Sequence, residues 1–338
     1  LVRGRTHTSA VPPVTDERTE MHNLHPDASA QNQLDVLVIG EALVDIVNTR
    51  QGTISYPGGS PANVAYGLGR LGIRTGLLTA IGKDDHGAAI TAHLQSAGVQ
   101  LLPGSKSLNR TATATATLAT DGSASYEFDI LWELAPVAPA MIPKVVHTGS
   151  IATFLAPGAA TVRTLLEQCH DSCLITYDPN IRPALLGSHA EAKKIFEDLL
   201  PLTDVVKLSD EDAQWLYPTS SPDDVASRLL KQGARLAVIT RGAEGALLAT
   251  SGTRLNIPSV KTAVADTIGA GDSYMSALIF ELLTRAEKAF APTALEIIGQ
   301  TAAAAAAITV SRPGANPPTS EELQMRLDGL KQAPLAAV

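Results

Sequence analysis

The chain has 338 residues, 45% of them hydrophobic and 18% charged, and a formal net charge of −8. This composition is typical of one large or two small globular α/β domains, and the negative charge without a Lys/Arg cluster argues against a nucleic-acid surface. No apolar run approaches the roughly 20 uncharged residues that a membrane span needs, the longest being the Ala-rich segment 302–308. Residues 1–33 are polar and lack the apolar core of a secretory signal, so they are expected to form a disordered tail.

From residue 34 onward, short runs of β-branched residues alternate with helical patterns, which is typical of a doubly wound, mostly parallel sheet flanked by helices. Strands are expected at 34–40, 75–81, 145–149, 174–178, 205–209 and 235–240, with an extended pair at 246–249 and 254–257. Helices are expected at 60–71, 85–96, 157–170, 188–200, 210–216, 222–232, 274–283 and 293–310. We therefore expect a single α/β domain over residues 34–333.

Two segments, 44–57 and 111–132, break this alternation because their polar and apolar residues alternate with period two. Turn sequences at 50–52 and 120–123 split each segment into two halves. We expect two antiparallel hairpins inserted into the core, forming a small antiparallel sheet that covers a site at the strand ends. The exposed face of such a sheet could also pair with another copy of the chain.

The sequence contains two cysteines, Cys169 and Cys173. A metal site would need further ligands at suitable spacing, and none follow. We therefore expect two near-surface thiols in a reducing cytosol, and a cytoplasmic location.

The segment 266–273, Asp-Thr-Ile-Gly-Ala-Gly-Asp-Ser, predicts an anion site that carries its own base. Gly269, Ala270 and Gly271 lead into an apolar run with helical spacing, so their N–H groups would lie at a helix N-terminus, where negative charge is favoured. A carboxylate there, Asp272, repels a bound phosphate unless it has a role such as orienting and deprotonating a hydroxyl. On this segment alone, an Asp that merely caps the helix explains the pattern equally well.

A second group of residues precedes the first predicted helix. The segment 58–63, Gly-Gly-Ser-Pro-Ala-Asn, allows close approach to its backbone and begins the helix with Ser60 as a cap. Asn63 costs helix propensity, so it is expected to have a partner, and a sugar hydroxyl would suit it. Asp45 lies just beyond the first strand, where ligands bind in open α/β sheets. A surface Asn and a solvated hairpin Asp are the alternatives.

Further polar segments follow later strands. The turn at 240–245, Thr-Arg-Gly-Ala-Glu-Gly, would suit nucleotide phosphate and ribose, although any β-turn can have this pattern. The segments 178–182 and 207–212 gather carboxylates at strand ends, where a hydrated Mg²⁺ is expected. The acidic first turn of a helix accounts for part of 210–212. There is no Walker A loop, and no Gly-x-Gly-x-x-Gly follows the first strand, which argues against a dinucleotide-binding fold.

Together, Gly-Gly-Ser-Pro-Ala-Asn at 58–63 and Asp-Thr-Ile-Gly-Ala-Gly-Asp at 266–272 resemble the two signatures of the PfkB family of ribokinase-like carbohydrate kinases. The resemblance covers about residues 34–320. It implies an α/β core with a β-sheet lid, and transfer of the ATP γ-phosphate to a sugar hydroxyl. It also implies ATP and Mg²⁺ as cofactors and, as in many members, K⁺.

The match of motifs implies a role for each residue. Asp272 would be the catalytic base, and Gly269, Ala270 and Gly271 the anion hole. The implied sugar-binding residues are Asp45, Gly58, Gly59 and Asn63. The implied nucleotide-binding residues are Lys207, Thr240, Gly242, Gly245 and Thr267. A monovalent cation would lie near Asp266 and the loop 311–314, and Mg²⁺ would meet Asp212 through water. The family commonly has Asn-x-x-Glu where this chain has Ser209 and Asp212, which puts the metal detail in question but not the activity.

Within the family, the segments 40–42, 109–112, 178–182 and 207–211 resemble bacterial and plant fructokinases, so fructose is the expected substrate. The same pieces occur in 2-keto-3-deoxygluconate kinases, where Arg110 or Arg182 would meet the carboxylate of the substrate. Ribokinase is a further alternative. A catalytically silent sugar-binding regulator is the alternative from another class, and the intact Asp272 argues against it. We expect a homodimer clasped through the lid, with no nucleic-acid or membrane partner.

Overall fold

The computed structural model describes residues 33–49, 52–118, 124–135 and 143–332. The chain divides into two units, 1–33 and 34–338, and the description below concerns the second. The expected N-terminal tail lies outside the described residues, except for Gln33, and so stays a prediction. Most of the two hairpin turns expected at 50–52 and 120–123 also lies outside them.

Nine strands within the described ranges form one central sheet, in the order β13-β12-β11-β10-β9-β8-β1-β4-β5. Neighbours from β11 to β5 are parallel, and β12 and β13 add an antiparallel edge. The strands are β1 Val36–Ile39, β4 Thr75–Leu78, β5 Gln100–Leu101, β8 Val145–Gly149, β9 Leu174–Asp178, β10 Val205–Ser209, β11 Leu236–Thr240, β12 Ala246–Ala249 and β13 Arg254–Ile257. The doubly wound, mostly parallel sheet expected from the sequence is confirmed.

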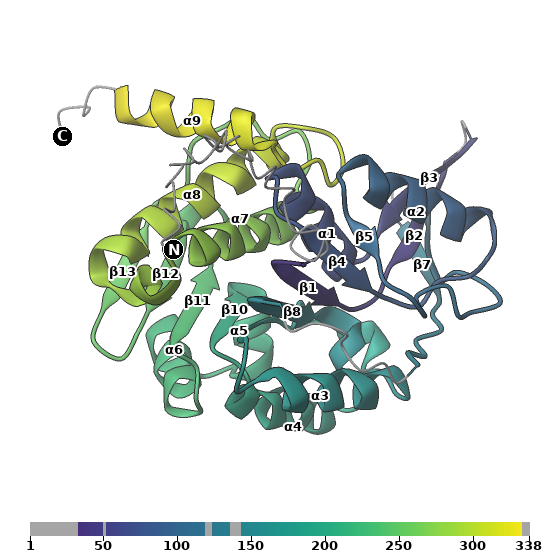
Figure 1. Ribbon diagram of the computed structural model, residues 1–338, viewed down its shortest axis with the longest axis horizontal. Helices are drawn as coiled ribbons and strands as arrows, with labels where there is room; N and C mark the ends of the chain where they lie inside the picture. Colours follow the sequence, from purple (N-terminus) through teal and green to yellow (C-terminus); the bar gives the residue numbers. More distant parts are fainter. Residues whose placement is uncertain (1–32, 50–51, 119–123, 136–142, 333–338) are drawn as a thin grey trace, which may run out of the picture. The chain divides into compact units, whose positions relative to one another are not determined.

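Helices cover both faces of this sheet, as Figure 1 shows. One layer packs with the strand side chains of Val36 and Val38, and consists of α1 Ser60–Arg70, α2 Asp85–Ser96, α7 Ala270–Arg285, α8 Pro292–Val310 and α9 Ser320–Gln332. The other packs with Leu37 and Ile39, and consists of α3 Gly158–Cys169, α4 His189–Leu199, α5 Asp210–Leu216 and α6 Pro222–Lys231. Because the central strands are buried on both faces, their sequences are continuous apolar runs rather than alternating ones.

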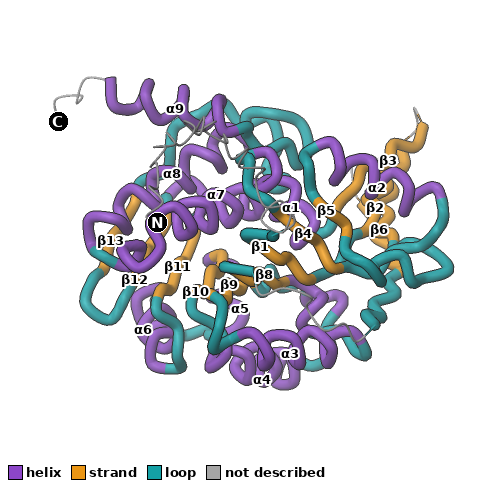
Figure 2. Tube along the Cα trace, in the orientation of Figure 1, coloured by secondary structure: helices purple, strands orange, loops and turns teal. Residues whose placement is uncertain are grey.

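A separate four-stranded sheet has the order β3-β2-β6-β7 and lies beside α2 (Figure 2). Its strands are β2 Leu43–Thr49, β3 Gly52–Gly58, β6 Thr113–Leu118 and β7 Ala124–Asp129. The hairpins β2–β3 and β6–β7 are antiparallel, as the period-two patterns predict. The hairpins join through β2 and β6, which run parallel, so the small sheet is mixed rather than wholly antiparallel. We call this sheet the lid.

Two elements have no counterpart among the expected ones. Strand β5 has only two residues, too few to produce a periodic pattern. Helix α9 is mostly exposed and buries Leu323 alone, so its apolar signal is weak. Helix α7 begins at Ala270, inside the predicted anion loop, four residues before the start of the apolar run.

The long helix α8 corrects the expectation about apolar runs. Among the described helices it is the one that could span a membrane by length and composition, and 67% of its apolar window is buried inside the protein. It packs on α7, so its apolar character is that of a core helix.

The burial of the two cysteines also differs from the expectation. Cys169 and Cys173 are buried rather than near the surface, and burial raises the pKa of both thiols, so both stay protonated and unreactive.

Trp132 anchors the chain where it returns from the lid to the core. Its side chain is buried, its indole N–H donates to the carbonyl of Ala152 over 3.0 Å, and its own carbonyl accepts from the N–H of Gly158. A Cβ atom on Gly158 would collide with the indole ring. Glycine at the start of α3 therefore leaves the space that the indole ring of Trp132 occupies.

This contact predicts opposite effects for two Gly→Ala changes in helices. Gly158→Ala should destabilise the protein by about 1–3 kcal/mol, the usual cost of overpacking a buried site. Gly329→Ala on α9 has open space around its Cβ, so it should be neutral or stabilising by about 0.5–1 kcal/mol. Thermal and denaturant unfolding measure both, and equal stabilisation by the two changes would contradict the packing of Trp132 on Gly158.

Candidate active site

A cleft of about 1440 Å³ opens at the carboxyl ends of the central strands. Its walls come from the segments that follow β1, β8, β9, β10 and β11, from the first turns of α1 and α7, from α8, and from lid strands β2, β6 and β7. This is the edge where ligands bind in open α/β sheets. Nearly all of the site residues predicted from the sequence line this cleft: Asp45, Gly59, Asn63, Arg182, Lys207, Asp212, Thr240, Gly242, Gly245, Thr267, Gly269, Ala270, Gly271 and Asp272.

The first turn of α7 forms one wall with its backbone. Gly269, with φ of 75°, occupies the N-cap position, and no side chain caps the helix. A Cβ atom on Gly269 would lie 2.7 Å from that of Ala315, so both the backbone conformation and the packing require glycine here. The N–H of Ala270 donates to the carbonyl of Thr267 over 3.3 Å. Since no side chain occupies the first turn, its other N–H groups can face an anion, with the helix dipole behind them.

Asp272 lies in this first turn with 9% of its surface exposed. One carboxylate oxygen accepts from the hydroxyl of Ser60 over 2.6 Å, and the other accepts from the side-chain amide of Asn63 over 2.8 Å. Burial raises the pKa of Asp272, and these two hydrogen bonds partly offset the rise. A buried carboxylate with a raised pKa is a better proton acceptor than a free one, while the hydrogen bonds fix its direction.

The hydrogen-bond partner of Asn63 therefore differs from the sugar hydroxyl expected from the sequence. Its amide donates to Asp272, so the partner that justifies an Asn in the first turn of α1 is a carboxylate of the protein rather than only a sugar hydroxyl. The side chain still lines the cleft. Ser60 was expected to cap α1, but α1 has no side-chain cap, and the hydroxyl of Ser60 binds Asp272 instead.

The two glycines before α1 make room for other parts of the site. A Cβ atom on Gly58 would collide with the carboxylate of Asp45, and one on Gly59 would lie 2.7 Å from the carbonyl of Glu41. Gly59 also has φ of 98°, which favours glycine. Gly58 thus holds Asp45 by packing and is not itself among the cleft residues. Burial raises the pKa of Asp45 to about 6, and the charge of Arg182 opposes the rise.

Lys207 is the buried cation of the site. Its ammonium lies 2.6 Å from an oxygen of Asp178, and a Cβ atom on Gly271 would be 3.5 Å from its nitrogen. Burial opposes its charge, but Asp178, Asp212 and Asp272 outweigh burial and raise the pKa of Lys207. The ammonium therefore stays protonated beside the N–H groups of α7. The other oxygen of Asp178 is buried and has no hydrogen-bond partner among the described residues.

The far end of the cleft combines a turn with an apolar wall. Thr240 ends β11, and Gly242 and Gly245 in the following turn have φ of 49° and 88°. A Cβ atom on Gly245 would collide with the carbonyl of Ile257, so this turn is packed against β13. The wall consists of small side chains of α8, namely Ala303, Ala306, Ala307 and Val310. A flat apolar ring could lie against such a surface.

The predicted metal residues have backbone partners. Both oxygens of Asp212 accept backbone N–H groups, from Ile181 over 2.9 Å and from Ser209 over 3.2 Å, as part of a capping box on α5. The oxygens of Asp266 accept from the N–H groups of Ile268 and Gly314, and these hydrogen bonds hold its pKa below the usual range. Asp266 thereby joins the anion loop to the loop 311–314. Within the described ranges, no three His, Cys, Asp or Glu side chains are grouped to hold a metal.

Arg110 does not reach the cleft. Its guanidinium makes a two-bond ion pair with Asp129 across the lid, and it is absent from the residues that line the cleft. Arg182, in contrast, lines the cleft, donates only to the carbonyls of Asn180 and Ile181, and forms no ion pair within the described part of the chain. Of the two arginines predicted to bind substrate, the structure brings only Arg182 to the site.

Glu41 is a cleft residue for which the sequence analysis gave no role. It follows β1 directly, is 4% exposed, and accepts from the N–H of Ala152 over 3.2 Å. Ser150, also in the cleft, has φ of 54°, which is unusual for a residue with a side chain. The signal for Glu41 was present, since an acidic residue at the end of a buried strand is unusual, but the sequence could not show that the lid covers it.

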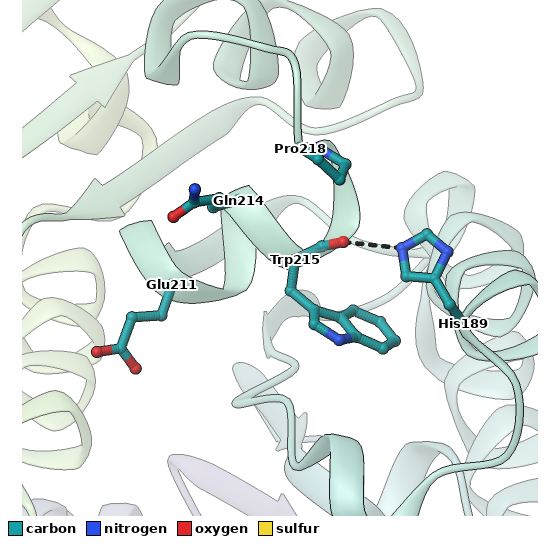
Figure 3. Close-up of a pocket in the computed structure, with 5 residues that line it drawn as sticks. All are labelled: His189, Glu211, Gln214, Trp215 and Pro218. Atoms are coloured by element: carbon teal, nitrogen blue, oxygen red, sulfur yellow. Dashed lines mark hydrogen bonds between the residues drawn. The ribbon is translucent and has the colours of Figure 1, made fainter.

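A smaller, open pocket of about 560 Å³ lies on the outer side of α5. Figure 3 shows its five residues, with the imidazole of His189 donating to the carbonyl of Trp215 over 2.8 Å and Glu211 pointing away from both. Only Glu211 and Trp215 are shared with the large cleft. Unlike the large cleft, this pocket is not lined by Lys207 or by the first turns of α1 and α7.

Comparison with known proteins identifies the family and the fold. A family model described as pfkB family carbohydrate kinase matches residues 33–322. The chain belongs to the pfkB family of carbohydrate kinases. A fructokinase of Rhizobium leguminosarum bv. trifolii is 32% identical over 259 residues, covering 73% of this chain and 79% of its own, and fructokinase-2 of Solanum habrochaites is 31% identical over 319 residues, covering 87% and 96%.

Solved structures agree with this assignment. A fructokinase of Vibrio cholerae O395, solved with fructose, ADP and calcium, superposes with a TM-score of 0.75 at 25% identity, covering 86% of this chain and 98% of its own. A fructokinase of Xylella fastidiosa with bound ATP has a TM-score of 0.76 at 23% identity, covering 88% and 99%, and so supports the fold. This pfkB protein is an ATP-dependent carbohydrate kinase, and the family resemblance seen in the sequence is confirmed.

Proposed function

We propose that this pfkB kinase phosphorylates fructose with ATP, yielding a fructose phosphate and ADP. The observation that carries the proposal is the buried Asp272 carboxylate, held by Ser60 and Asn63 beside Lys207 in the first turn of α7, which no side chain caps. Relatives named fructokinase at about 30% identity support the choice of sugar.

Asp272 would be the base of the reaction. The hydroxyl oxygen of the sugar attacks the γ-phosphorus, the bond from that phosphorus to the β–γ bridging oxygen breaks, and ADP leaves. The hydroxyl proton passes to Asp272. Because phosphoryl transfer has a loose transition state, proton loss can come late, and the main task of Asp272 is to aim the hydroxyl in line.

The transferring phosphoryl group would meet the N–H groups of Gly269, Ala270 and Gly271 together with Lys207. These donors are fixed in place before the reaction, and one such donor is worth roughly 2.7–4 kcal/mol in related oxyanion holes. The lid hairpins would exclude water, which competes with the sugar as a nucleophile. Asp45 and Asn63, on the lid side, would bind the sugar.

The nucleotide would lie at the other end of the cleft. The phosphates and ribose would contact Thr240, Gly242, Gly245 and Thr267, and the base would pack on the alanines of α8.

Ala306→Phe should therefore raise the KM for ATP while the KM for the sugar stays constant. An unchanged KM for ATP would contradict it.

Mg²⁺ and K⁺ complete the proposal. The unpartnered oxygen of Asp178 and the exposed carboxylates of Asp210 and Glu211 fit a hydrated Mg²⁺ bound mainly through the nucleotide, whereas Asp212 acts as a helix cap. Mg²⁺ supplies charge neutralisation to the phosphates when bound. Asp266 and the loop 311–314 would form the K⁺ site, because hydrogen bonds join the two segments there: the N–H of Gly314 donates to the Asp266 carboxylate, and the N–H groups of Ala265 and Asp266 donate to the carbonyl of Val310. Full activity in a buffer without K⁺ would contradict that site.

A second candidate substrate is 2-keto-3-deoxygluconate. Arg182 favours it, because this guanidinium lies in the cleft without a carboxylate partner among the described residues. Ribose remains an alternative without a specific contact in its favour.

Coupled ADP release with Mg-ATP and K⁺ tests the substrate. We expect the highest kcat/KM on fructose among fructose, 2-keto-3-deoxygluconate, ribose, adenosine and fructose 6-phosphate. Preference for the keto acid, lost in Arg182→Gln, would replace fructose by a sugar acid. No turnover on any of the five would contradict the proposed function.

Asp272→Asn tests the base. The change keeps the volume and one acceptor but removes the proton acceptor, so turnover should fall at least ~10²-fold with the KM for ATP little changed. Asp171→Asn, on a side chain 89% exposed, is the matched control and should leave turnover unchanged. Turnover of Asp272→Asn within threefold of wild type would remove this residue from the role.

We also propose that two copies pair through their lid sheets. Ile54 and Tyr56 on β3 are exposed large apolar residues of the lid, 49% and 51% exposed, whereas the exposed Phe128 on β7 lines the cleft. Light scattering should therefore find a dimer, and Ile54→Lys should shift it toward monomer because it places a charge in the apolar contact. A wild-type monomer at all concentrations would contradict the pairing.

The cytoplasmic location expected from the sequence also stays a prediction.

A further inference from the structure

Glu41 is a buried carboxyl group in the sugar end of the cleft that the proposed mechanism does not use. It lies at the exit of β1, where it lines the same region as Asp45, Gly59 and Asn63. The carbonyl of Glu41 packs against Gly59, so the backbone at residue 41 is fixed by the start of α1. Burying an ionised carboxylate is costly unless a cation pairs with it.

Among the described residues, no cationic side chain contacts the carboxyl group of Glu41. Its carboxyl group accepts from the N–H of Ala152, and the hydroxyl of Ser150 lies close enough to bond to it. The carbonyl of the same residue, Ala152, accepts from the indole of Trp132, which anchors the return from the lid. Ala152 is thus held at both its N–H and its carbonyl, and these two hydrogen bonds link Glu41, after β1, to Trp132, which follows the lid.

The charged groups around the cleft do not neutralise Glu41. Lys207 on β10 pairs with Asp178 on β9, and Arg182 after β9 acts on Asp45 and Asp272. Asp272 on α7 faces Glu41 as a like charge. Burial, reinforced by Asp272, raises the pKa of Glu41 to about 8, although the hydrogen bonds from Ser150 and Ala152 oppose the rise. At neutral pH the group therefore carries its proton.

We propose that Glu41 binds the sugar as a neutral acid: one oxygen fixes the turn at Ser150–Ala152, and the O–H donates to an oxygen of the substrate. Asp45 and Asp272, as carboxylates, accept hydrogen bonds, so a protonated Glu41 supplies the complementary donor on the same side of the cleft. This role rests on the proposed sugar-kinase function and deepens it. It also makes sugar binding sensitive to alkaline pH, because ionisation removes the donor and adds a charge beside Asp272.

Glu41→Gln and Glu41→Ala separate this role from a merely structural one. Glutamine keeps a donor and an acceptor without ionising, so kcat/KM for the best sugar of the panel should stay within about threefold of wild type at pH 7. Wild-type activity should decline above pH about 8, and this alkaline decline should disappear in Glu41→Gln. Glu41→Ala should raise the KM for the sugar at least about tenfold, as expected for one lost buried hydrogen bond, and leave the KM for ATP unchanged.

A melting experiment tests the protonation without substrate. Between pH 4.5 and about 8 the folded protein keeps a proton that the unfolded chain has released, so the wild type loses stability as pH rises through this window. The melting temperature of Glu41→Gln minus that of wild type should increase from pH 6 to 8 and then level off. Glu321→Gln, an exposed carboxyl in the first turn of α9, is the control and should show a constant difference.

The outcomes distinguish the proposed role of Glu41 from the proposed sugar-kinase function. A tenfold loss of kcat/KM in Glu41→Gln at pH 7, an unchanged alkaline decline, or a melting difference independent of pH would each overturn the role of Glu41. A protein inactive on every sugar of the panel would contradict the proposed function instead, and the melting comparison would still decide whether Glu41 holds its proton.

Discussion

The candidate active site depends on one carboxylate held by two distant segments of the chain. Asp272 accepts from Ser60 and Asn63, which precede it by 212 and 209 residues. Each segment begins a helix after a glycine with positive φ, Gly59 before α1 and Gly269 before α7, and neither helix has a side-chain cap. The two uncapped helix N-termini meet at the same carboxylate, so the two signatures form a single structure rather than a sugar motif and a separate phosphate motif.

Several positions around this contact are glycines because another part of the protein packs where a Cβ atom would lie. Gly58 admits Asp45, Gly59 admits the backbone of Glu41, and Gly269 admits Ala315 from the loop after α8. Gly158 does the same for Trp132, which connects the lid to the turn that Glu41 holds. The glycines thus determine where the functional carboxylates lie, and a substitution at any of them would move a group that is not its sequence neighbour.

Sequence patterns predicted the architecture well because they are local. The central strands are apolar runs, and β8, β9 and β10 have the expected bounds. The short β5 and the mostly exposed α9 lack a periodic signal, and the parallel pairing of β2 with β6 depends on contacts between distant segments. The glycine loop of 269–271 was also predicted correctly as a helix start, since small residues before an apolar helical run are a local feature.

Side-chain partners were harder to predict, because each choice depends on which groups the fold brings within reach. Arg110 is expected to bind substrate until the lid places Asp129 opposite it. Asp212 has the spacing of a metal residue and equally the spacing of a helix cap; its hydrogen bond from the N–H of Ser209 makes it a cap, and the N–H of Ile181 occupies its other oxygen. The proton on Glu41 is a property of burial and of its distance from cations, neither of which a linear sequence contains.

The charge of the cleft explains how a protein of net charge −8 can bind a polyphosphate. Seven acidic side chains line it, Glu41, Asp45, Asp178, Asp210, Glu211, Asp212 and Asp272, against three basic ones, Arg182, Lys207 and Lys261. Fixed backbone dipoles supply the remaining attraction for an anion, and they do so locally at the first turns of α1 and α7. A neutral Glu41 removes one of these negative charges at physiological pH. The carboxylates that remain charged are the ones with a cation or a helix N-terminus near them, so the site can hold a base next to a phosphate without repelling it.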